Sequence, residues 1–261
     1  VRAMAAPIEP EATFVVGERR ELDLTEVDVV LVRTDPPFDR AYLHLTLVLD
    51  LLDGITPVIN APRGLRDANE KLYALRFPSV TPPTMVAADV ERLRAFAVEQ
   101  GAAVVKPIDG HGGRGVLVVR PDDDNAPAIL DAATDRGRTP VVAQRYLPGV
   151  RDGDKRILLL DGEPLGGAVL RLPAAEDFRA NICVGGTVEV VDLDDADRRI
   201  IDAVAPSLRA DGLVFVGLDV VADMLTEVNV TSPTGLRQLT DLGGGRPDLD
   251  VIRWLEQRVA G

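Results

Sequence analysis

The sequence predicts an α/β (α+β) protein built from three pieces. Strand and helix patterns alternate in the first quarter of the chain, which is typical of a small parallel α/β unit. From about Pro83 the predicted strands follow each other closely and are expected to pair as hairpins. Two further hairpins with flanking helices fill the last part. A length of 261 residues is compatible with one to three such units.

We expect the first piece to cover residues 1–67. The stretch "VDVVLVR" is short, apolar and β-branched, as buried strands are. An amphipathic helix and the short strand "PVIN" follow it, and "PRGLRDANEKLYALRF" has helical spacing with a break near Asp67. The predicted elements are a strand at 27–33, a helix at about 39–52, a strand at 57–60 and helical turns at 62–77.

The second piece, residues 68–147, has shorter connections and more strands. The predicted order is strand "PTMV", a helix near 88–100, strand "AAVVKP", a glycine loop, strand "GVLVVR", a helix within 123–135 and strand "PVVAQRY". We expect these strands to pair as hairpins.

The third piece, residues 148–261, begins with the hairpin "KRILLLDGEPLGGAVLRLP", which turns at Asp161-Gly162. The glycine-containing segment "AAEDFRANICVGG" (174–186) is expected to be a mobile loop. A helix at 194–210, the hairpin within "GLDVVADMLTEVNVTSP" (217–233) and a last helix ending near Val259 complete the chain.

Composition argues against several classes of protein. Hydrophobic residues are 46% of the chain and charged residues 27%, as in ordinary globular proteins. No apolar run approaches the ~20 residues of a membrane helix. The net charge of −13 argues against a general nucleic-acid binder, whose surface is normally cationic.

One cysteine, Cys183, fits a reducing cytosol, and two histidines, His44 and His111, argue against a zinc site. Since Val1 is not an initiator methionine and no signal peptide opens the chain, we expect a cytoplasmic protein whose upstream residues are absent here.

Two carboxylates and an amide interrupt the valines of the late hairpin. If its turn centres on Asp223, Asp219 lies across from Glu227, and Asn229 shares their face. Like charges placed directly opposite each other destabilise a sheet unless a cation lies between them. Hard oxygen ligands of this kind suit Mg²⁺, so a magnesium site is one interpretation. A solvent-facing sheet edge with incidental acids is the other.

The glycines of "VVKPIDGHGGRGVLVV" (104–119) lie between two strands, which excludes the dinucleotide-fold fingerprint and the Walker P-loop. Such a loop can instead fold over nucleotide phosphates, with Lys106 as a nearby point charge. A flexible turn with a solvated lysine is the alternative. Arg156 and Arg171 are predicted at the same end of their hairpin, and with Lys71 and Lys106 they form a candidate anion clamp for phosphoryl transfer. His111 is interpreted as loop filler, with a contact to a phosphate as the alternative.

Seven motifs, in order along nearly the whole chain, resemble those of the bacterial glutathione synthetases of the ATP-grasp superfamily. They are "RTDPPFD" (33–39), "NEKL" (69–72), "KPIDGHGGRGV" (106–116), "DGDKRILLLDGEP" (152–164), "RLP" (171–173), "RANICVGG" (179–186) and "GLDVVADMLTEVNVTSPTG" (217–235). The family's extreme N-terminal strand–helix segment has no counterpart, so the first domain is expected to be incomplete. Two smaller departures are His111, where an apolar residue is usual, and Ala222, where glycine is usual.

The resemblance implies an ATP-grasp fold with a Rossmann-like N-terminal domain. It also implies a ligase that joins γ-L-glutamyl-L-cysteine to glycine with ATP and Mg²⁺, or Mn²⁺ in its place, and releases ADP and phosphate. The dipeptide's cysteinyl carboxylate would be phosphorylated, and the glycine amine would attack the acyl phosphate. A homotetramer is implied as well.

The resemblance further implies a role for each matching side chain. Asp219, Glu227 and Asn229 would be the metal ligands. ATP would contact Lys71, Lys106, the loop residues Asp109, Gly110, Gly112, Gly113 and Gly115, the hinge residues Gln144, Tyr146 and Leu147, and Asp154 near the ribose. Arg156 and Arg171 would stabilise the transferring phosphoryl group. The peptide substrates would meet Arg33, Arg179, Asn181, Thr231, Ser232 and Pro233. The segment 173–187 would close over the acyl phosphate.

Two other functions stay open on the sequence alone. An ATP-grasp ligase that joins a different amino acid or peptide would share the nucleotide motifs, although "RTDPPFD" and residues 171–186 favour the synthetase. A non-catalytic nucleotide-binding module would bind Mg²⁺·ATP and form no ADP.

Overall fold

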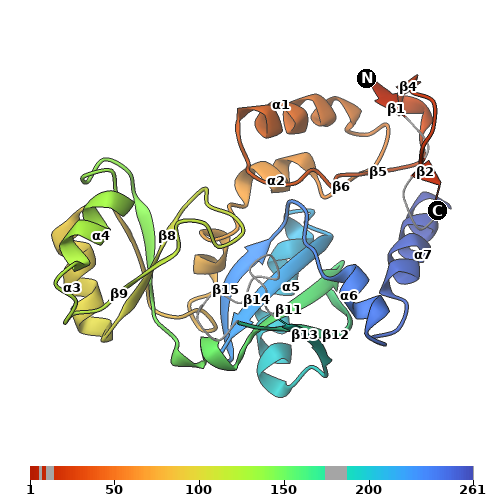
Figure 1. Cartoon of the computed structure of the whole chain (residues 1–261). Helices are drawn as coiled ribbons and strands as arrows, with labels where there is room; N and C mark the ends of the chain where they lie inside the picture. The colour runs from red at the N-terminus through yellow and green to blue at the C-terminus, as the bar shows by residue number, and fades with distance from the viewer. Residues whose placement is uncertain (6–7, 10–14, 174–186, 261) are drawn as a thin grey trace.

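The structure is a computed structural model that describes residues 1–5, 8–9, 15–173 and 187–260. Figure 1 shows a four-stranded sheet with α3 and α4 on the left, a five-stranded sheet in the centre and the α1–α2 layer above it. No helix in the described ranges is both long and apolar enough to cross a membrane.

The N-terminal part contains the predicted parallel unit. Strands β5 (Val30–Leu31) and β6 (Val58–Ile59) pair in parallel, joined by α1 (Arg40–Leu49) and the 3-10 turn η2 (Asp50–Leu52). The Asp39 side chain caps α1 by accepting the Tyr42 N–H at 2.9 Å. The predicted break after Asp67 is confirmed, because α2 (Pro62–Asp67) ends there and η3 (Tyr73–Arg76) follows.

Two N-terminal strand pairs were not predicted. β1 (Arg2–Ala5) pairs with β4 (Arg20–Asp23), and the pair of β2 (Ile8–Glu9) and β3 (Val15–Val16) stands between them in the chain; the 3-10 turn η1 (Leu24–Glu26) follows. "RELD" has no run of apolar residues, and β2 and β3 are two residues long, so neither pattern is distinctive.

The four-stranded antiparallel sheet has the order β7-β10-β8-β9 and is covered by two helices. Its elements are β7 (Thr84–Ala87), α3 (Val90–Gln100), β8 (Ala103–Pro107), β9 (Leu117–Val119), α4 (Ala126–Ala133) and β10 (Val141–Arg145). The expected β8–β9 hairpin is confirmed. The expectation that β7 also forms a hairpin with its sequence neighbour was wrong: β7 and β8 flank β10 and run parallel to each other. Parallel strands joined by a helix need a crossover, which leaves room for a strand between them.

The five-stranded antiparallel sheet has the order β13-β12-β11-β14-β15. Its strands are β11 (Asp154–Leu160), β12 (Glu163–Leu172), β13 (Thr187–Val191), β14 (Phe215–Val221) and β15 (Met224–Asn229), and β13 was not predicted. The predicted turn at Asp161-Gly162 is confirmed, and both residues have positive φ, as two-residue hairpin turns require. Ala222 and Asp223 adopt positive φ at the β14–β15 turn. The associated helices are α5 (Asp195–Ala210), α6 (Leu236–Asp241) and α7 (Pro247–Ala260), with the 3-10 turn η4 (Pro148–Asp152) before β11.

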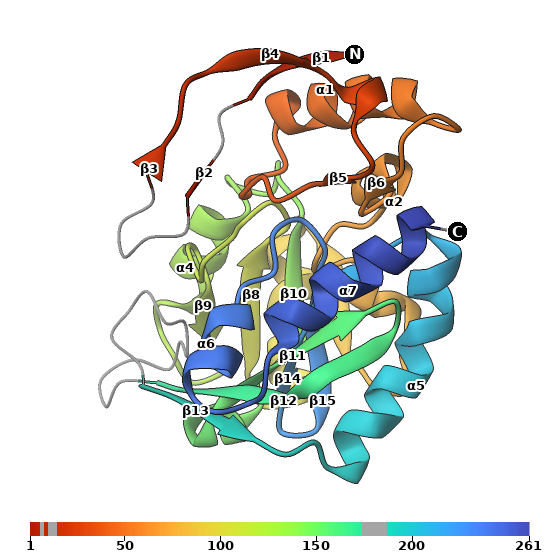
Figure 2. The same ribbon diagram turned by 90° about the vertical axis from the view of Figure 1, so that its right-hand side faces the viewer.

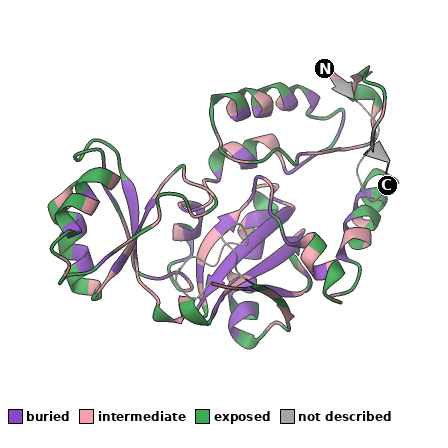
Figure 3. Ribbon diagram, in the orientation of Figure 1, coloured by how far each residue is buried: buried purple, intermediate pink, exposed green. Residues whose placement is uncertain are grey.

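Alternate residues of β11 serve two different cores. Ile157 and Leu159 pack in a core that includes the buried face of α5, whereas Leu158 and Leu160 pack in a core with α6 and α7. Figure 2 shows α5 and α7 along different sides of this sheet, and Figure 3 shows that its central strands are largely buried. Both faces of the sheet are therefore covered by helices, except at the polar end of the face that carries Leu158 and Leu160.

Asn60, which follows β6, connects the N-terminal part to this sheet. It is 4% exposed, its Nδ2 donates to the carbonyls of Phe215 (2.9 Å) and Val230 (2.8 Å), and its Oδ1 accepts the Phe215 N–H at 2.7 Å. Asn60→Ala would leave three buried backbone groups without partners. We expect it to lower the free energy of unfolding by roughly 2–4 kcal/mol, measured by urea denaturation. Asn125→Ala is the matched control, since Asn125 is exposed and its side chain makes no cap hydrogen bond. A loss no larger than the control's would contradict the connecting role.

Candidate active site

A row of charged side chains crosses four strands on one face of the five-stranded sheet. Arg156 lies opposite Asp219, which lies opposite Glu227, and Asp154 lies opposite Arg171. Residues alternate between faces along a strand, so these side chains share the face of Leu158 and Leu160. Helices α6 and α7 cover the apolar end of that face. The charged end faces the glycine loop of the other sheet across a cavity.

Gly217 leaves the space that the Arg156 side chain occupies. A Cβ at Gly217 would lie 2.9 Å from Arg156 Cδ and 3.0 Å from Pro233 Cβ. Any larger residue at this position of β14 would therefore displace Arg156 from its place beside Asp219.

Two arginines hold the Asp219 carboxylate. Arg156 donates from Nε to Oδ1 at 2.5 Å and from Nη2 to Oδ2 at 3.0 Å, and Arg171 Nη2 lies 3.0 Å from Oδ1. Arg171 also donates to Asp154 Oδ2 at 2.7 Å. Burial opposes the charge of Asp219, but Arg156 and Arg171 outweigh it and lower the pKa of Asp219. Burial raises the pKa of Asp154, and Arg171 only partly offsets this.

The predicted geometry of the late hairpin is confirmed, but one premise was wrong. Asp219 lies across from Glu227, and Asn229 pairs with Gly217 on the same face. However, Asp219 is not an unpaired acid that needs a metal, because the guanidinium groups of β11 and β12 neutralise it. These partners come from strands more than 45 residues away, so no pattern within the hairpin could reveal them.

The donor set still fits a divalent cation. The only ion pair of Glu227 within the described residues is a loose one with Lys106, at 3.4 Å. Asn229 uses its Nδ2 to donate to the Gly217 carbonyl at 3.3 Å, so the amide oxygen is the atom left to accept. Two carboxylates and an amide oxygen on adjacent strands are hard ligands of the type that Mg²⁺ and Mn²⁺ prefer.

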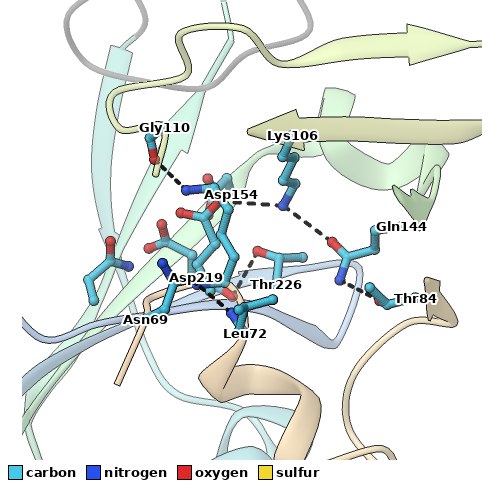
Figure 4. A network of polar contacts seen from close by, with 12 residues as sticks. Asn69, Leu72, Thr84, Lys106, Gly110, Gln144, Asp154, Asp219 and Thr226 are labelled. Carbon is cyan, nitrogen blue, oxygen red and sulfur yellow. Dashed lines mark hydrogen bonds and ion pairs between the residues drawn. The ribbon is translucent and has the colours of Figure 1, made fainter. Parts of the chain in front are cut away.

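The glycine loop and two buried lysines, Lys71 and Lys106, form the opposite wall. Figure 4 shows Lys106 and Gly110 of this wall. Gly112, Gly113 and Gly115 adopt positive φ, a conformation that a side chain would disfavour. Lys71 Nζ donates to the Gly110 carbonyl and ties the loop to the 69–72 segment. Lys106 Nζ donates to Gln144 Oε1 at 3.2 Å, and Gln144 Nε2 donates to Thr84 at 3.1 Å.

The hinge segment 144–147 follows directly from β10. The N–H groups of Arg145 and Tyr146 already donate to the carbonyls of Pro83 (2.9 Å) and Ala102 (3.0 Å). Within the described chain, the Leu147 N–H has no such partner. Among the hinge N–H groups, Leu147 is therefore the one available to a ligand.

The cavity has a volume of about 500 Å³ and brings most of the predicted site residues together. The predicted residues that line it are Lys71, Lys106, Gly110, Gly112, Gly113, Gln144, Tyr146, Leu147, Asp154, Arg156, Arg171, Asp219, Glu227, Asn229, Thr231 and Ser232. Asp109 lines an adjoining recess, and Gly115 lines neither space. Arg33 and Pro233 line neither space. Arg33 donates to the Pro233 carbonyl at 2.9 Å and lies over the Phe215 ring, so it supports the 231–233 turn. Arg179, Asn181 and most of the 173–187 segment lie outside the described residues.

Several cavity residues were missed by sequence reasoning. Glu70, Asp35 and Thr226 line the cavity, as do His111 and Arg114 at the tip of the glycine loop. Glu70 and Asp35 stand inside motifs that were singled out for their neighbours Lys71 and Arg33. A carboxylate within a cationic motif was the signal that could have identified them. His111 lines the cavity, so both of its interpretations, loop filler and phosphate contact, stay predictions.

Two proteins of known structure with the same fold are named as a synthetase and a ligase. The D-cycloserine synthetase DcsG superposes with a TM-score of 0.65 at 20% sequence identity, covering 90% of this chain and 86% of that one. A D-alanine–D-alanine ligase from Bacillus anthracis, complexed with ATP, superposes with a TM-score of 0.57 at 22% identity, covering 81% of this chain and 74% of that one. At these identities the similarity concerns the fold alone, and it confirms the predicted fold class.

Sequence comparison is more specific. The glutathione synthetase of Synechococcus elongatus is 51% identical over 247 residues, which span 94% of this chain and 76% of that protein. The glutathione synthetase of Bradyrhizobium diazoefficiens is 43% identical over 262 residues, spanning 100% of this chain and 82% of that protein. Residues 1–66 match the family described as "Prokaryotic glutathione synthetase, N-terminal domain", and residues 70–244 match "Prokaryotic glutathione synthetase, ATP-grasp domain". The chain therefore belongs to the prokaryotic glutathione synthetase family.

Proposed function

We propose that the chain ligates γ-glutamylcysteine to glycine with ATP, forming glutathione, ADP and phosphate. Family membership over nearly the whole chain supports the substrates. The observation that carries the chemistry is the row of carboxylates and guanidinium groups that faces two buried lysines across one cavity. This arrangement can hold two anions and a divalent cation in contact.

The reaction needs such a site because a carboxylate is a poor electrophile with a poor leaving group. Transfer of the γ-phosphoryl group to the dipeptide's cysteinyl carboxylate breaks the bond between that group and ADP and makes an acyl phosphate. The glycine amine then attacks the acyl carbon, phosphate leaves, and the amine loses a proton. In the first step two anions must approach each other, so cations are required around them.

ATP-grasp ligases use ATP with divalent metal ions, and we infer Mg²⁺, with Mn²⁺ as the alternative. Asp219, Glu227 and Asn229 would hold the ion. When bound, it neutralises phosphate oxygens and orients the terminal phosphoryl group.

The chain's own groups have distinct tasks around the nucleotide. The Leu147 N–H would donate to the adenine, and Asp154 would lie near the ribose. Lys71 and Lys106 would bind the phosphates under the glycine loop. Arg156 and Arg171 would donate to the transferring phosphoryl group. They reach it from β11 and β12, where carboxylates already fix their orientation.

The peptide substrates would bind at the other end of the cavity. Thr231 and Ser232 would face the dipeptide, with Arg33 holding their turn through the Pro233 carbonyl. Arg179 and Asn181 would contribute from the 173–187 segment, which would exclude water from the acyl phosphate. We further infer a homotetramer in the cytoplasm, on family resemblance.

The test is coupled ADP release by the purified chain with γ-glutamylcysteine, glycine, ATP and Mg²⁺. Turnover is expected only when dipeptide and metal are both present, and a chelator in excess should abolish it. A panel of other amino acids and peptides separates this function from that of another ATP-grasp ligase. Calorimetric Mg²⁺·ATP binding without ADP formation under any mixture would reject the enzyme in favour of a nucleotide-binding module.

A further inference from the structure

The turn of residues 69–72, between α2 and η3, is fixed by Asn69. Its Oδ1 accepts the N–H groups of Lys71 and Leu72, each at 3.1 Å, and its carbonyl accepts the Tyr73 N–H at 2.8 Å. Asparagine side chains commonly fix turns by accepting from backbone groups that follow them. The amide oxygen of Asn69 is therefore used within the turn, and its Nδ2 group is left to donate elsewhere.

The Nδ2 group contacts the glycine loop, which runs from β8 to β9. It donates at 3.2 Å to the carbonyl of Ile108, the first residue after β8. Lys71, from the same turn, donates from Nζ to the carbonyl of Gly110. Figure 4 shows Asn69 and Leu72 of the turn and Gly110 of the loop. The turn therefore holds the beginning of the loop at two carbonyl groups.

The same turn is bonded to the sheet that carries the candidate metal ligands. The Glu70 carbonyl accepts the Val228 N–H at 2.8 Å, and Glu70 Oε1 accepts the Thr231 hydroxyl at 2.8 Å. On β15, Val228 stands between Glu227 and Asn229. The turn thus connects the strand that would hold the metal to the loop that would cover the phosphates.

A glycine-rich loop benefits from such a connection. Gly112, Gly113 and Gly115 adopt positive φ, and glycine loses more conformational freedom on ordering than any other residue. A loop that is already held in place before its ligand arrives spares the ligand part of this entropic cost.

We propose that Asn69 is a positioning residue, which holds the glycine loop over the phosphates through the Ile108 carbonyl. This role rests on the ATP-binding part of the proposed function. Asn69 acts without touching ATP, since it lines the adjoining recess and not the cavity. Lys71 supports the same loop position. An ammonium has three N–H groups, so Lys71 can keep the Gly110 contact while it donates to a phosphate.

Asn69→Asp separates the two tasks of the side chain. A carboxylate still accepts from Lys71 and Leu72, so the turn should persist, but it has no N–H to donate to Ile108 and repels that carbonyl oxygen. The equilibrium between held and released loop should shift by roughly 3- to 10-fold, the worth of one such hydrogen bond.

Loop release can be measured without catalysis. Arg114 is exposed at the tip of the loop, so trypsin cleavage after it reports the released population. In the free protein, Asn69→Asp should raise the rate of this cleavage by the same factor. Mass spectrometry identifies the fragments 1–114 and 115–261 and so distinguishes this cut from others.

Nucleotide affinity should change in parallel. Calorimetry with Mg²⁺ and a non-hydrolysable ATP analogue should show a dissociation constant higher by up to the same factor, because the ligand must then also order the loop. In the activity assay, KM for ATP should rise, whereas kcat and the KM values for γ-glutamylcysteine and glycine should stay at wild-type values. A residue that only stabilised the turn would not produce this split.

Two further variants keep the result interpretable. Asn69→Ser keeps a shorter acceptor for the turn, cannot reach Ile108 and adds no charge beside Lys71, so it should repeat the effect. It also serves if Asn69→Asp does not fold. Asn125→Asp is the matched control, since Asn125 is exposed and its side chain makes no cap hydrogen bond. The control should match the wild type in cleavage and affinity.

The outcomes separate the positioning role from the function. A wild type that binds the analogue but shows no dipeptide-dependent ADP release rejects the proposed ligation and leaves the cleavage and affinity comparison valid. Wild-type cleavage and affinity in both Asn69 variants would overturn the positioning role, even if their stability in urea falls. An equal change in the Asn125→Asp control would overturn it as well.

Discussion

Glu227→Gln is expected to lower kcat by roughly 100- to 1000-fold, the range measured when one preorganised charge-stabilising group is removed from an active site. The variant replaces one of two opposed carboxylates on β14 and β15 with a neutral amide. The other carboxylate, Asp219, is shared with two arginines, so Glu227 carries a large part of the negative charge available to the metal. ADP release measured against Mg²⁺ concentration should show half-saturation at higher metal concentrations.

The fold should tolerate this change, because the one ion pair of Glu227 within the described chain is 3.4 Å long and its side chain is 22% exposed. Glu163→Gln is the matched control, since Glu163 is 77% exposed and pairs with Arg209 at the surface. The control should keep wild-type kcat. Near-normal activity of Glu227→Gln across the metal titration would contradict the ligand role.

Arg171→Lys is expected to lower kcat by roughly 100-fold or more, although the charge is retained. Arg171 Nη2 lies 2.7 Å from Asp154 Oδ2 and 3.0 Å from Asp219 Oδ1, so one planar group joins two buried carboxylates. A lysine ammonium is a point charge and cannot keep both contacts while also donating to a phosphoryl oxygen. Single-turnover measurement of ADP formation at saturating substrates reports this step directly.

Stability should also fall, because a buried carboxylate that loses its partner is penalised. Complete removal of one partner from a buried ion pair costs about 3–5 kcal/mol, and we expect lysine to cost less than this. Arg209→Lys is the control: Arg209 is 43% exposed, and its pair with Glu163 lies at the surface. If Arg171→Lys loses stability but keeps kcat, Arg171 is structural and its catalytic assignment is wrong.

The strands and helices that were predicted correctly have strong local signals. Asp161-Gly162 and the residues flanking it specify their own turn, and Asp194 caps the N-terminus of α5 in a capping box with Asp197. Among the elements that were missed, β1 to β4 are short or polar, and each is paired with a partner strand. The missed strand β13, "TVEVV", does carry a β-branched pattern that local reasoning could have used.

The candidate site likewise has features that the sequence predicts and features that it does not. The opposition of Asp219 and Glu227 follows from a hairpin register that local alternation predicts, and the family motifs name the lysines and arginines without coordinates. The ion pairs of Asp219, the contact of Arg33 with the 231–233 turn, the contact of Asn60 with Val230 and the hydrogen bond between Thr231 and Glu70 join residues 48 to 200 positions apart. No local pattern encodes such contacts.

The sequence by itself determined the order of the elements with strong local signals, the family and the residue types that a phosphoryl-transfer site requires, because those depend on local periodicity and on motifs in a linear order. Only the tertiary structure decided which charges neutralise each other and which remain without a partner. Ion pairing depends on distance in space and on exclusion of water, and both arise when the sheets and the N-terminal layer pack together.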